Sequence, residues 1–324
     1  MILRPLAVSL LFLVAAATQA SPLAQDEHFV LVRLQSRQNF SDLAQTWLGD
    51  AGHAWQIAEI NGNQAQLAGQ LVAIPRKPVN PTSVYVDGYR VLPILCYHQF
   101  TSKDTASHPL EITARAFEEQ LQYLVTNNFQ ILTFSDVEKI LREHQPIPDK
   151  AVVITVDDGY RSVFDVAWPI LKKYGVPATL FIYTDFIGAG SAMSWEQLQR
   201  LASSELIDIQ SHGKSHSSLS RLPEDKTAAS YATRIQSEID GSGAAFRKHL
   251  DASPVYLSYP YGNSSKTASE LYQRAGYELA ATVTRGDNTV FSDPYLLHRT
   301  MIYDSHNLSD FAEFVRGFKT KNLR

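Results

Sequence analysis

Two adjacent acidic residues, Asp157 and Asp158, follow the apolar run 152–156 and precede a glycine. A run rich in β-branched residues predicts a buried strand of a parallel sheet, which places the two carboxylates at the carboxyl end of that strand. Folds of the α/β class keep their chemistry at this edge. Two like charges side by side resist joint ionisation unless a cation shares the site. The alternative is an Asp-Asp-Gly turn that caps the next helix, and these residues alone favour neither interpretation.

Two histidines four residues apart, His212 and His216, follow a later apolar stretch at 206–210. This interval puts two imidazoles on one face of a helical turn, although such pairs are also common on protein surfaces. Because both motifs follow a predicted strand, one sheet edge can bring the histidines to Asp158. Two imidazoles and one carboxylate are the ligand set of a catalytic zinc-type site. Asp157 would then be free to accept a proton from the attacking water.

A third motif, Ser-Tyr-Pro-Tyr-Gly at 258–262, ends another predicted strand. Pro260 fixes the backbone and the following glycine frees it, so this turn can aim a backbone N–H at a substrate oxygen. The aromatic rings of Tyr259 and Tyr261 suit the faces of sugars. A plain Pro-Gly turn with two packing tyrosines is the alternative.

The elements that must position these motifs alternate between strand and helix along most of the chain. This βαβα order predicts a parallel sheet or an α/β barrel, and a length of roughly 235 residues suits one barrel domain. Strands are expected at 92–97, 129–134, 151–156, 177–183, 206–210, 255–258 and 278–283, and helices at 114–127, 135–144, 161–174, 195–203, 227–249 and 265–275.

The amino terminus has the pattern of a secretory signal peptide over residues 1–20. Arg4 precedes the apolar stretch 6–17, which is too short to span a bilayer, and small residues surround a cleavage point near Ala20. We therefore expect an exported protein, periplasmic or extracellular, without stable membrane insertion. The single cysteine, Cys96, excludes an internal disulfide. A net charge of -4 with no basic run gives no nucleic-acid footprint.

Residues 27–76 are expected to form a small separate module, followed by a proline-containing linker over 77–90. Alternation at 28–34, helical spacing in two following segments and a closing strand at 70–75 predict a strand-helix-helix-strand unit. It resembles LysM carbohydrate-binding domains, which bind N-acetylglucosamine-containing glycans. The usual Gly-Asp-Thr-Leu before the first helix is replaced by residues 37–40, Arg-Gln-Asn-Phe, so a purely structural module is the alternative.

Taken together, the motifs TVDDG, SHGKSH and SYPYG, with MSWEQLQRL ahead of the second, resemble the NodB-type polysaccharide deacetylases of carbohydrate esterase family four. The resemblance covers about residues 90–315 and implies a distorted (β/α) barrel over 91–318. It also implies a divalent metal, most commonly Zn²⁺ with Ni, Co or Fe as alternatives. The implied roles are Asp157 as catalytic base, Asp158, His212 and His216 as metal ligands, the Tyr261 backbone N–H as oxyanion donor, and Tyr259, Pro260 and Tyr160 as substrate contacts.

Two departures from the family pattern affect the catalytic assignments. The arginine that usually orients the base is replaced by Ser258, and the fifth motif is only approximated by the residues that end in His298. A branch of the family that acts on extracellular poly-N-acetylglucosamine shows similar changes, and its early Tyr-His motif matches Tyr97-His98. By this resemblance His98 is the general acid, with His298 as the alternative acid. Either histidine could instead be structural.

The sequence therefore predicts an exported metal-dependent hydrolase that removes N-acetyl groups from an N-acetylglucosamine-containing polysaccharide. Peptidoglycan, poly-N-acetylglucosamine and chitin-like polymers all remain candidate substrates. We expect a monomer whose partner is this polysaccharide. The alternatives are a non-catalytic cell-wall glycan-binding protein and an esterase of O-acetyl sugars such as acetylxylan.

Overall fold

The structure, a computed structural model, describes residues 21–62, 66–76, 80, 82–85, 87–143 and 145–321. The chain divides into two compact units after Asn80. The signal peptide predicted at 1–20 lies outside the described residues. Among the helices of the described ranges, none combines the length and the apolar character that a bilayer crossing requires.

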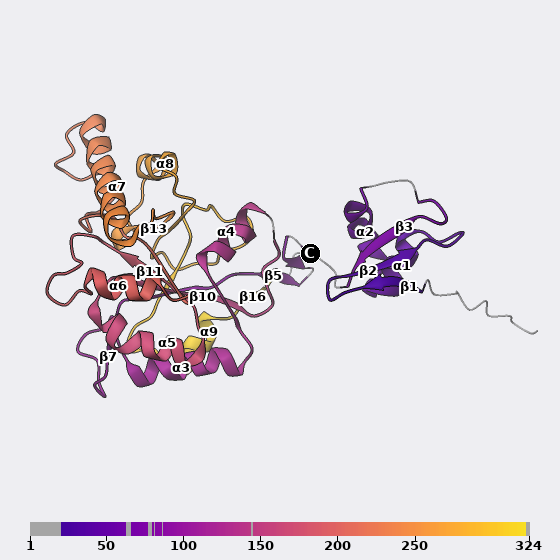
Figure 1. The fold of residues 1–324 in the computed structure, drawn as a ribbon, viewed down its shortest axis with the longest axis horizontal. Coiled ribbons are helices and arrows are strands. Elements are labelled where there is room, and N and C mark those ends of the chain that lie inside the picture. The colour runs from indigo at the N-terminus through magenta and orange to yellow at the C-terminus, as the bar shows by residue number, and fades with distance from the viewer. Residues whose placement is uncertain are drawn as a thin grey trace, which may run out of the picture. The chain divides into compact units, whose positions relative to one another are not determined.

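The first unit packs two helices against one face of a three-stranded antiparallel sheet (Figure 1). Asn39 and Asp42 cap the first helix reciprocally, and Gly49 ends it in the left-handed conformation at φ 81°. The expected strand-helix-helix-strand order is present, but an additional strand precedes it, which short local patterning did not reveal. The elements are β1 (Pro22–Gln25), β2 (Phe29–Arg33), α1 (Phe40–Leu48), α2 (Ala54–Ile60) and β3 (Leu71–Pro75).

The second unit is built on a parallel sheet that closes into a distorted barrel, as the resemblance implied. Its strand order is β14-β13-β12-β11-β10-β6-β15, and β9 pairs with the start of β10. Leu297 bridges to Ala281 at one sheet edge, while Thr300 and Met301 pair with the other edge, so segment 297–301 connects the two. The strands are β6 (Ile94–Tyr97), β9 (Gln130–Leu132), β10 (Ala151–Asp158), β11 (Ala178–Ile182), β12 (Ile207–Ser211), β13 (Tyr256–Ser258), β14 (Leu279–Ala281) and β15 (Thr300–Met301).

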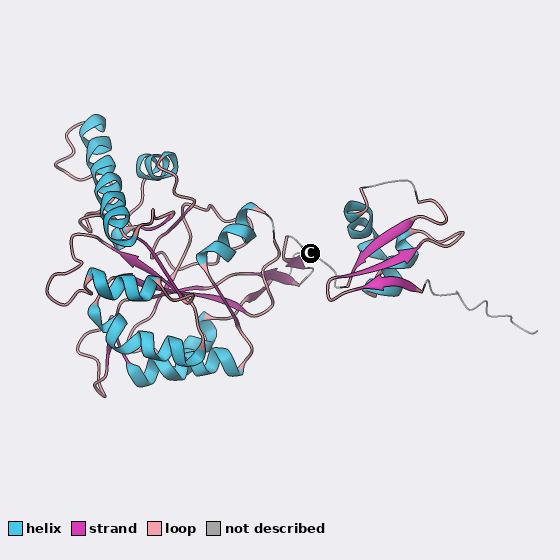
Figure 2. Ribbon diagram, in the orientation of Figure 1, coloured by secondary structure: helices cyan, strands magenta, loops and turns pink. Residues whose placement is uncertain are grey.

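Helices surround this sheet, as Figure 2 shows in cyan. Helix α3 packs against α5 and α9, and α7 packs against α6 and α8. Each predicted helix has a counterpart within a few residues, with the predicted helix 161–174 formed by the π-helical turn and α5 together. Helix α9 was not predicted. The helices are α3 (Ala114–Thr126), α4 (Phe134–Arg142), α5 (Trp168–Tyr174), preceded by a π-helical turn at Val163–Ala167, α6 (Trp195–Ala202), α7 (Ala228–Leu250), α8 (Lys266–Arg274) and α9 (Leu308–Phe314).

The predicted linker over 77–90 is shorter than expected. Strands β4 (Val84–Tyr85) and β5 (Gly88–Arg90) form a sheet with β16 (Phe318–Thr320), so both strands belong to the second unit. Two more short strands, β7 (Gln99–Thr101) and β8 (Glu111–Thr113), pair beyond β6. Strands of two or three residues carry too few side chains for a periodic pattern, and β16 pairs with a strand that lies far away in the sequence.

Strand β10 shows how the fold prepares a polar interior. Val152, Ile154 and Val156 pack into the apolar layer that also contains side chains of α3 and α5. The alternate positions, Val153, Thr155 and Asp157, therefore point to the inside of the barrel, because side chains alternate along a strand. Asp157 thus ends up buried because of its position in the strand.

Candidate active site

Both acids approach the same histidine, His212, because the chain turns sharply at Asp158. Asp157 ends the inward row of β10 with 1% of its surface exposed. Asp158 would face outward on a regular strand, but it has a φ of 76°, and Gly159 follows with a φ of 98°. This left-handed pair reverses the direction of the second carboxylate, at a conformational cost that non-glycine residues usually avoid. His212 Nε2 consequently lies 3.9 Å from Asp157 Oδ2 and 3.6 Å from Asp158 Oδ1.

Asp158, His212 and His216 form a cluster whose potential ligand atoms all lie within 4.8 Å of one another. His216 Nε2 lies 3.3 Å from Asp158 Oδ1. His212 Nδ1 lies 2.7 Å from the Ser258 carbonyl oxygen, to which a ring N–H can only donate, so its Nε2 is left with a lone pair facing the cluster. Burial also lowers the pKa of His212, which favours the neutral imidazole that metals bind.

These distances fit a divalent ion. Two donors at zinc–ligand distances of about 2.0–2.2 Å in a tetrahedral arrangement are roughly 3.3–3.6 Å apart. The separations of Asp158 Oδ1 from the two imidazole Nε2 atoms, 3.6 and 3.3 Å, have this size. Two neutral imidazoles and one carboxylate also leave at least one position open for a reactant.

A buried arginine that the sequence motifs did not identify holds Asp157. Arg299 Nη1 donates to Asp157 Oδ1 at 2.8 Å, and Arg299 Nη2 donates to Asp157 Oδ2 at 2.7 Å. Ser258 joins them, because its hydroxyl donates to Asp157 Oδ2 at 2.9 Å and accepts from Arg299 Nη2 at 2.7 Å. Burial alone would raise the pKa of Asp157, but the positive charge of Arg299 outweighs it and holds this pKa well below its usual range.

The missing arginine of the family pattern therefore has a counterpart elsewhere in the chain. Position 258 carries a serine, and the guanidinium comes instead from segment 297–301, which closes the barrel. One sequence signal pointed to it: Leu297 and Arg299 are two residues apart in an apolar stretch and thus share one face of a strand. That face proves to be the barrel interior, where Arg299 has 0% exposure.

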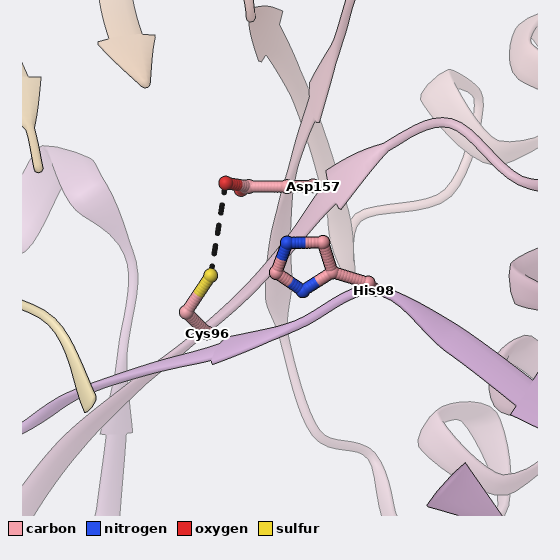
Figure 3. A group of neighbouring side chains, drawn as sticks. All are labelled: Cys96, His98 and Asp157. Carbon is pink, nitrogen blue, oxygen red and sulfur yellow. Dashed lines mark hydrogen bonds between the residues drawn. The ribbon is translucent and has the colours of Figure 1, made fainter. Parts of the chain in front are cut away.

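His98 lies beside the acid pair, and His298 is held elsewhere. Cys96, His98 and Asp157 have potential ligand atoms within 4.8 Å of one another. Figure 3 shows these three side chains together. Burial lowers the pKa of His98, against the opposing effect of the Asp157 and Asp158 charges. No hydrogen-bond partner for its Nδ1 is found among the described residues.

The alternative acid, His298, packs against the backbone around Gly286. A Cβ at Gly286 would overlap its ring, since the Nδ1 atom would be only 1.8 Å away. Asn288 binds the backbone of His298 on both sides, accepting from its N–H at 2.9 Å and donating to its carbonyl at 2.8 Å. The structure thus places His98 beside Asp157, next to the potential metal triad, and it places His298 in a packing position.

The third motif divides between the surface and the core. Tyr261 has a φ of 58°, its ring is 62% exposed, and it lies 4.5 Å from the His216 ring. The Tyr183 ring centroid also lies 4.8 Å from that of His216. Tyr160 is half-buried against Phe186, with ring centroids 5.1 Å apart.

Two of the residues predicted to contact the substrate, Tyr259 and Pro260, lie where a glycan would not reach their side chains. Tyr259 has 0% exposure and packs in the apolar cluster with Tyr272 and Tyr231, so its side chain has no surface to offer a glycan. Pro260 is also buried. The physical reason is the alternation of side chains at the end of β13, which sends the Tyr259 ring into the helix layer.

Comparisons with known proteins agree with this architecture. A family model described as polysaccharide deacetylase matches residues 144–280. YxkH of Bacillus subtilis, which bears the name of a polysaccharide deacetylase, is 29% identical over 228 residues, covering 70% of this chain and 77% of that protein. The poly-β-1,6-N-acetyl-D-glucosamine N-deacetylase of Staphylococcus epidermidis is 26% identical over 196 residues, covering 59% of this chain and 68% of that enzyme. For the Escherichia coli enzyme of that name the identity is 24%, and the match spans 39% of its length.

Solved structures share the fold of the second unit. IcaB from Ammonifex degensii superposes with a TM-score of 0.61 at 25% identity, covering 71% of this chain and 99% of that chain. The Streptococcus pyogenes deacetylase PplD gives a TM-score of 0.62 at 22% identity, covering 70% and 99%. The barrel after Asn80 therefore has the fold of the NodB-type deacetylases, and its residues 144–280 match the polysaccharide deacetylase family model.

Proposed function

We propose that this protein is an exported, metal-dependent N-deacetylase of poly-β-1,6-N-acetylglucosamine. One observation carries the catalytic part of this proposal: a potential metal triad, an arginine-held carboxylate and a half-buried histidine converge at one end of the barrel. A non-catalytic protein that only binds glycans would not require all of these catalytic groups together.

Asp158, His212 and His216 would hold the ion. When bound, a divalent ion supplies Lewis-acid activation, which lowers the pKa of an attacking water enough for a weak base to suffice. Asp157 is such a weak base, because Arg299 holds its pKa low. The fork of Arg299 fixes the plane of the carboxylate, so that the proposed base has no need to reorient during the reaction.

His98 would donate the proton that the departing amine requires. Its Nδ1 is buried and its ring lies beside Asp157, so a proton on the imidazole stays near the reacting group. The Tyr261 backbone N–H would stabilise the negative charge that develops on the acetamide oxygen. The left-handed conformation at Tyr261 supports this role, because it turns the local backbone away from the strand direction.

The choice of polymer rests on the relatives. Several of those matched are named poly-β-1,6-N-acetyl-D-glucosamine N-deacetylases, in Escherichia coli and in staphylococci. The signal-peptide pattern of residues 1–20 supports export to the place where such polymers lie. The first unit would act as a LysM-like glycan-binding module that keeps the enzyme on its polymer.

The test is acetate release from four acetylated polymers. Zinc-loaded protein is incubated with poly-β-1,6-N-acetylglucosamine, N-acetylglucosamine β-1,4-oligomers, peptidoglycan fragments and acetylxylan. We expect the fastest release from the β-1,6-linked polymer, loss of activity with a chelator, and recovery on adding zinc.

The Asp157→Asn protein serves as the control for contaminating activity. Faster release from peptidoglycan would contradict the assigned polymer and keep the N-deacetylase chemistry. Release from acetylxylan alone would show an esterase, and a rate that a chelator leaves unchanged would exclude the metal role.

A further inference from the structure

Helix α7 carries a buried carboxylate that faces the histidine loop and has no place in the chemistry above. Glu238 has 6% of its surface exposed. Its Oε2 accepts the backbone N–H of Lys214 at 2.7 Å and that of Ser215 at 2.9 Å. Its Oε1 accepts the hydroxyl of Ser215. Three donors from two consecutive loop residues thus converge on one carboxylate.

These contacts lie between the two histidines of the triad. His212 follows β12 and is fixed by Ser258, but His216 lies four residues further, after a loop of irregular backbone. Gly213 has a φ of 80° and His216 a φ of 60°, so this segment is neither helix nor strand. The carbonyls of Gly213 and Lys214 accept from the N–H groups of Thr184 and Asp185, but its own N–H groups at 214 and 215 have no such backbone acceptor among the hydrogen bonds of the described residues. A backbone of this kind keeps its shape only where its surroundings determine it. Glu238 is the group that satisfies its central N–H donors.

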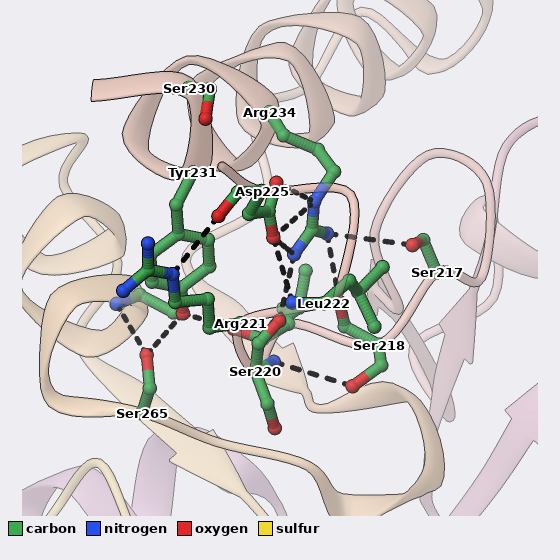
Figure 4. A network of polar contacts seen from close by, with 12 residues as sticks. Ser217, Ser218, Ser220, Arg221, Leu222, Asp225, Ser230, Tyr231, Arg234 and Ser265 are labelled. Carbon is green, nitrogen blue, oxygen red and sulfur yellow. Dashed lines mark hydrogen bonds and ion pairs between the residues drawn. The ribbon is translucent and has the colours of Figure 1, made fainter. Parts of the chain in front are cut away.

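The preceding turn of α7 anchors the chain that follows His216. Arg234, four residues before Glu238, donates to the carbonyls of Ser218 at 2.8 Å and Ser220 at 2.7 Å. It also forms an ion pair with the buried Asp225 at 2.8 Å (Figure 4). Residues four apart on a helix share one face, so both side chains reach the loop from the same side of α7.

We infer that Glu238 is a positioning residue for the metal ligand His216, with Arg234 securing the loop behind it. It sets the distance of the His216 imidazole from Asp158 and His212 before any ion arrives. Loss of Glu238 therefore weakens metal binding more than it weakens the fold. This inference rests on the proposed function only in taking the triad as the metal site.

The test measures zinc affinity without any substrate, by competition with a chromophoric chelator, in the full-length protein. Outer-shell partners of metal ligands are typically worth roughly 10–100-fold in affinity, and we expect a rise of this size in the zinc Kd of Glu238→Ala. Glu238→Gln retains one acceptor oxygen for the two backbone donors and should lose less. Gln236→Ala, on the exposed side of the same helix, is the matched control and should bind zinc as the wild type does.

A second readout separates positioning from general stability. The thermal midpoint is measured with chelator and with zinc, and the gain on adding zinc should shrink in Glu238→Ala and stay intact in Gln236→Ala. A folded Glu238→Ala protein with wild-type zinc Kd overturns the inference; should that variant fail to fold, wild-type affinity in Glu238→Gln overturns it. A wild-type protein without zinc binding would overturn both the inference and the metal site. Zinc binding without acetate release would overturn the proposed function alone.

Discussion

Arg299 and Asp157 lie 142 residues apart in the sequence and meet inside the barrel as a two-pronged ion pair, with N–O distances of 2.8 and 2.7 Å. Both side chains are almost completely buried. The pair joins β10, which carries the acids, to the segment that closes the barrel. It therefore links the integrity of the fold to the state of the proposed base.

Replacing Arg299 should affect both stability and turnover. Arg299→Ala leaves a buried carboxylate without its counter-charge, which costs about 3–5 kcal/mol for broken buried pairs. Arg299→Lys keeps the charge but cannot form the two parallel bonds, so we expect a folded protein with reduced kcat. Urea unfolding and acetate release measure the two effects. Wild-type kcat in a folded Arg299→Lys protein would contradict the role of the fork.

The two acids should separate by metal content. Asp157→Asn should retain zinc and lose most activity, because an amide cannot accept the proton of the attacking water. Asp158→Asn should lose zinc, since Asp158 Oδ1 lies 3.3 Å from His216 Nε2 and 3.6 Å from His212 Nε2. Elemental analysis of the purified variants decides the matter. Equal zinc loss in both would reverse or merge these assignments.

The two histidines test the general acid. His98→Ala should lower kcat by roughly two to four orders of magnitude, the usual worth of general acid catalysis, at normal zinc content. Burial lowers the pKa of His98, and only the protonated imidazole can donate. The wild-type rate should therefore fall as pH rises through this lowered pKa, and this alkaline limb should flatten in His98→Ala. His298→Ala is the comparison, and a larger loss there would exchange the two roles.

Acid should weaken the fold through Asp157. The pKa of Asp157 is lower in the folded protein than its unfolded value near about 3.9. Its ionised form thus stabilises the folded protein. This contribution is fully present above about pH 4 and is lost as the pH falls through the pKa that Asp157 has in the folded protein. Thermal midpoints measured with chelator should show the wild type losing its advantage over Asp157→Asn below about pH 4. An advantage that grows on acidification would have the wrong sign.

Deleting residues 21–80 tests the first unit. Every residue proposed for catalysis lies in the second unit, so turnover of short soluble oligomers should stay near wild type. Retention on insoluble polymer should fall, because two linked weak sites gain from effective concentration. Pull-down on poly-N-acetylglucosamine, peptidoglycan and chitin measures retention. Unchanged pull-down would show that the first unit does not contribute to glycan binding.

The sequence alone determined the order of the barrel elements and the residues of the potential metal triad. The reason is local: long apolar runs and helical spacing are readable within ten or twenty residues, and polar residues directly after a strand must lie at one sheet edge. The pairing of His212 and His216 with Asp158 followed from these rules without knowledge of the distances.

Only the tertiary structure decided which groups support the triad and the proposed base. Arg299 meets Asp157 because a two-residue strand closes the barrel, and Glu238 reaches the histidine loop because α7 packs beside it. Tyr259 faces the core for the same kind of reason. Contacts between residues far apart in sequence depend on how sheet and helices close around one another, and no local pattern records that closure. The left-handed turn at Asp158, which brings the second acid to the two histidines, belongs to this class as well.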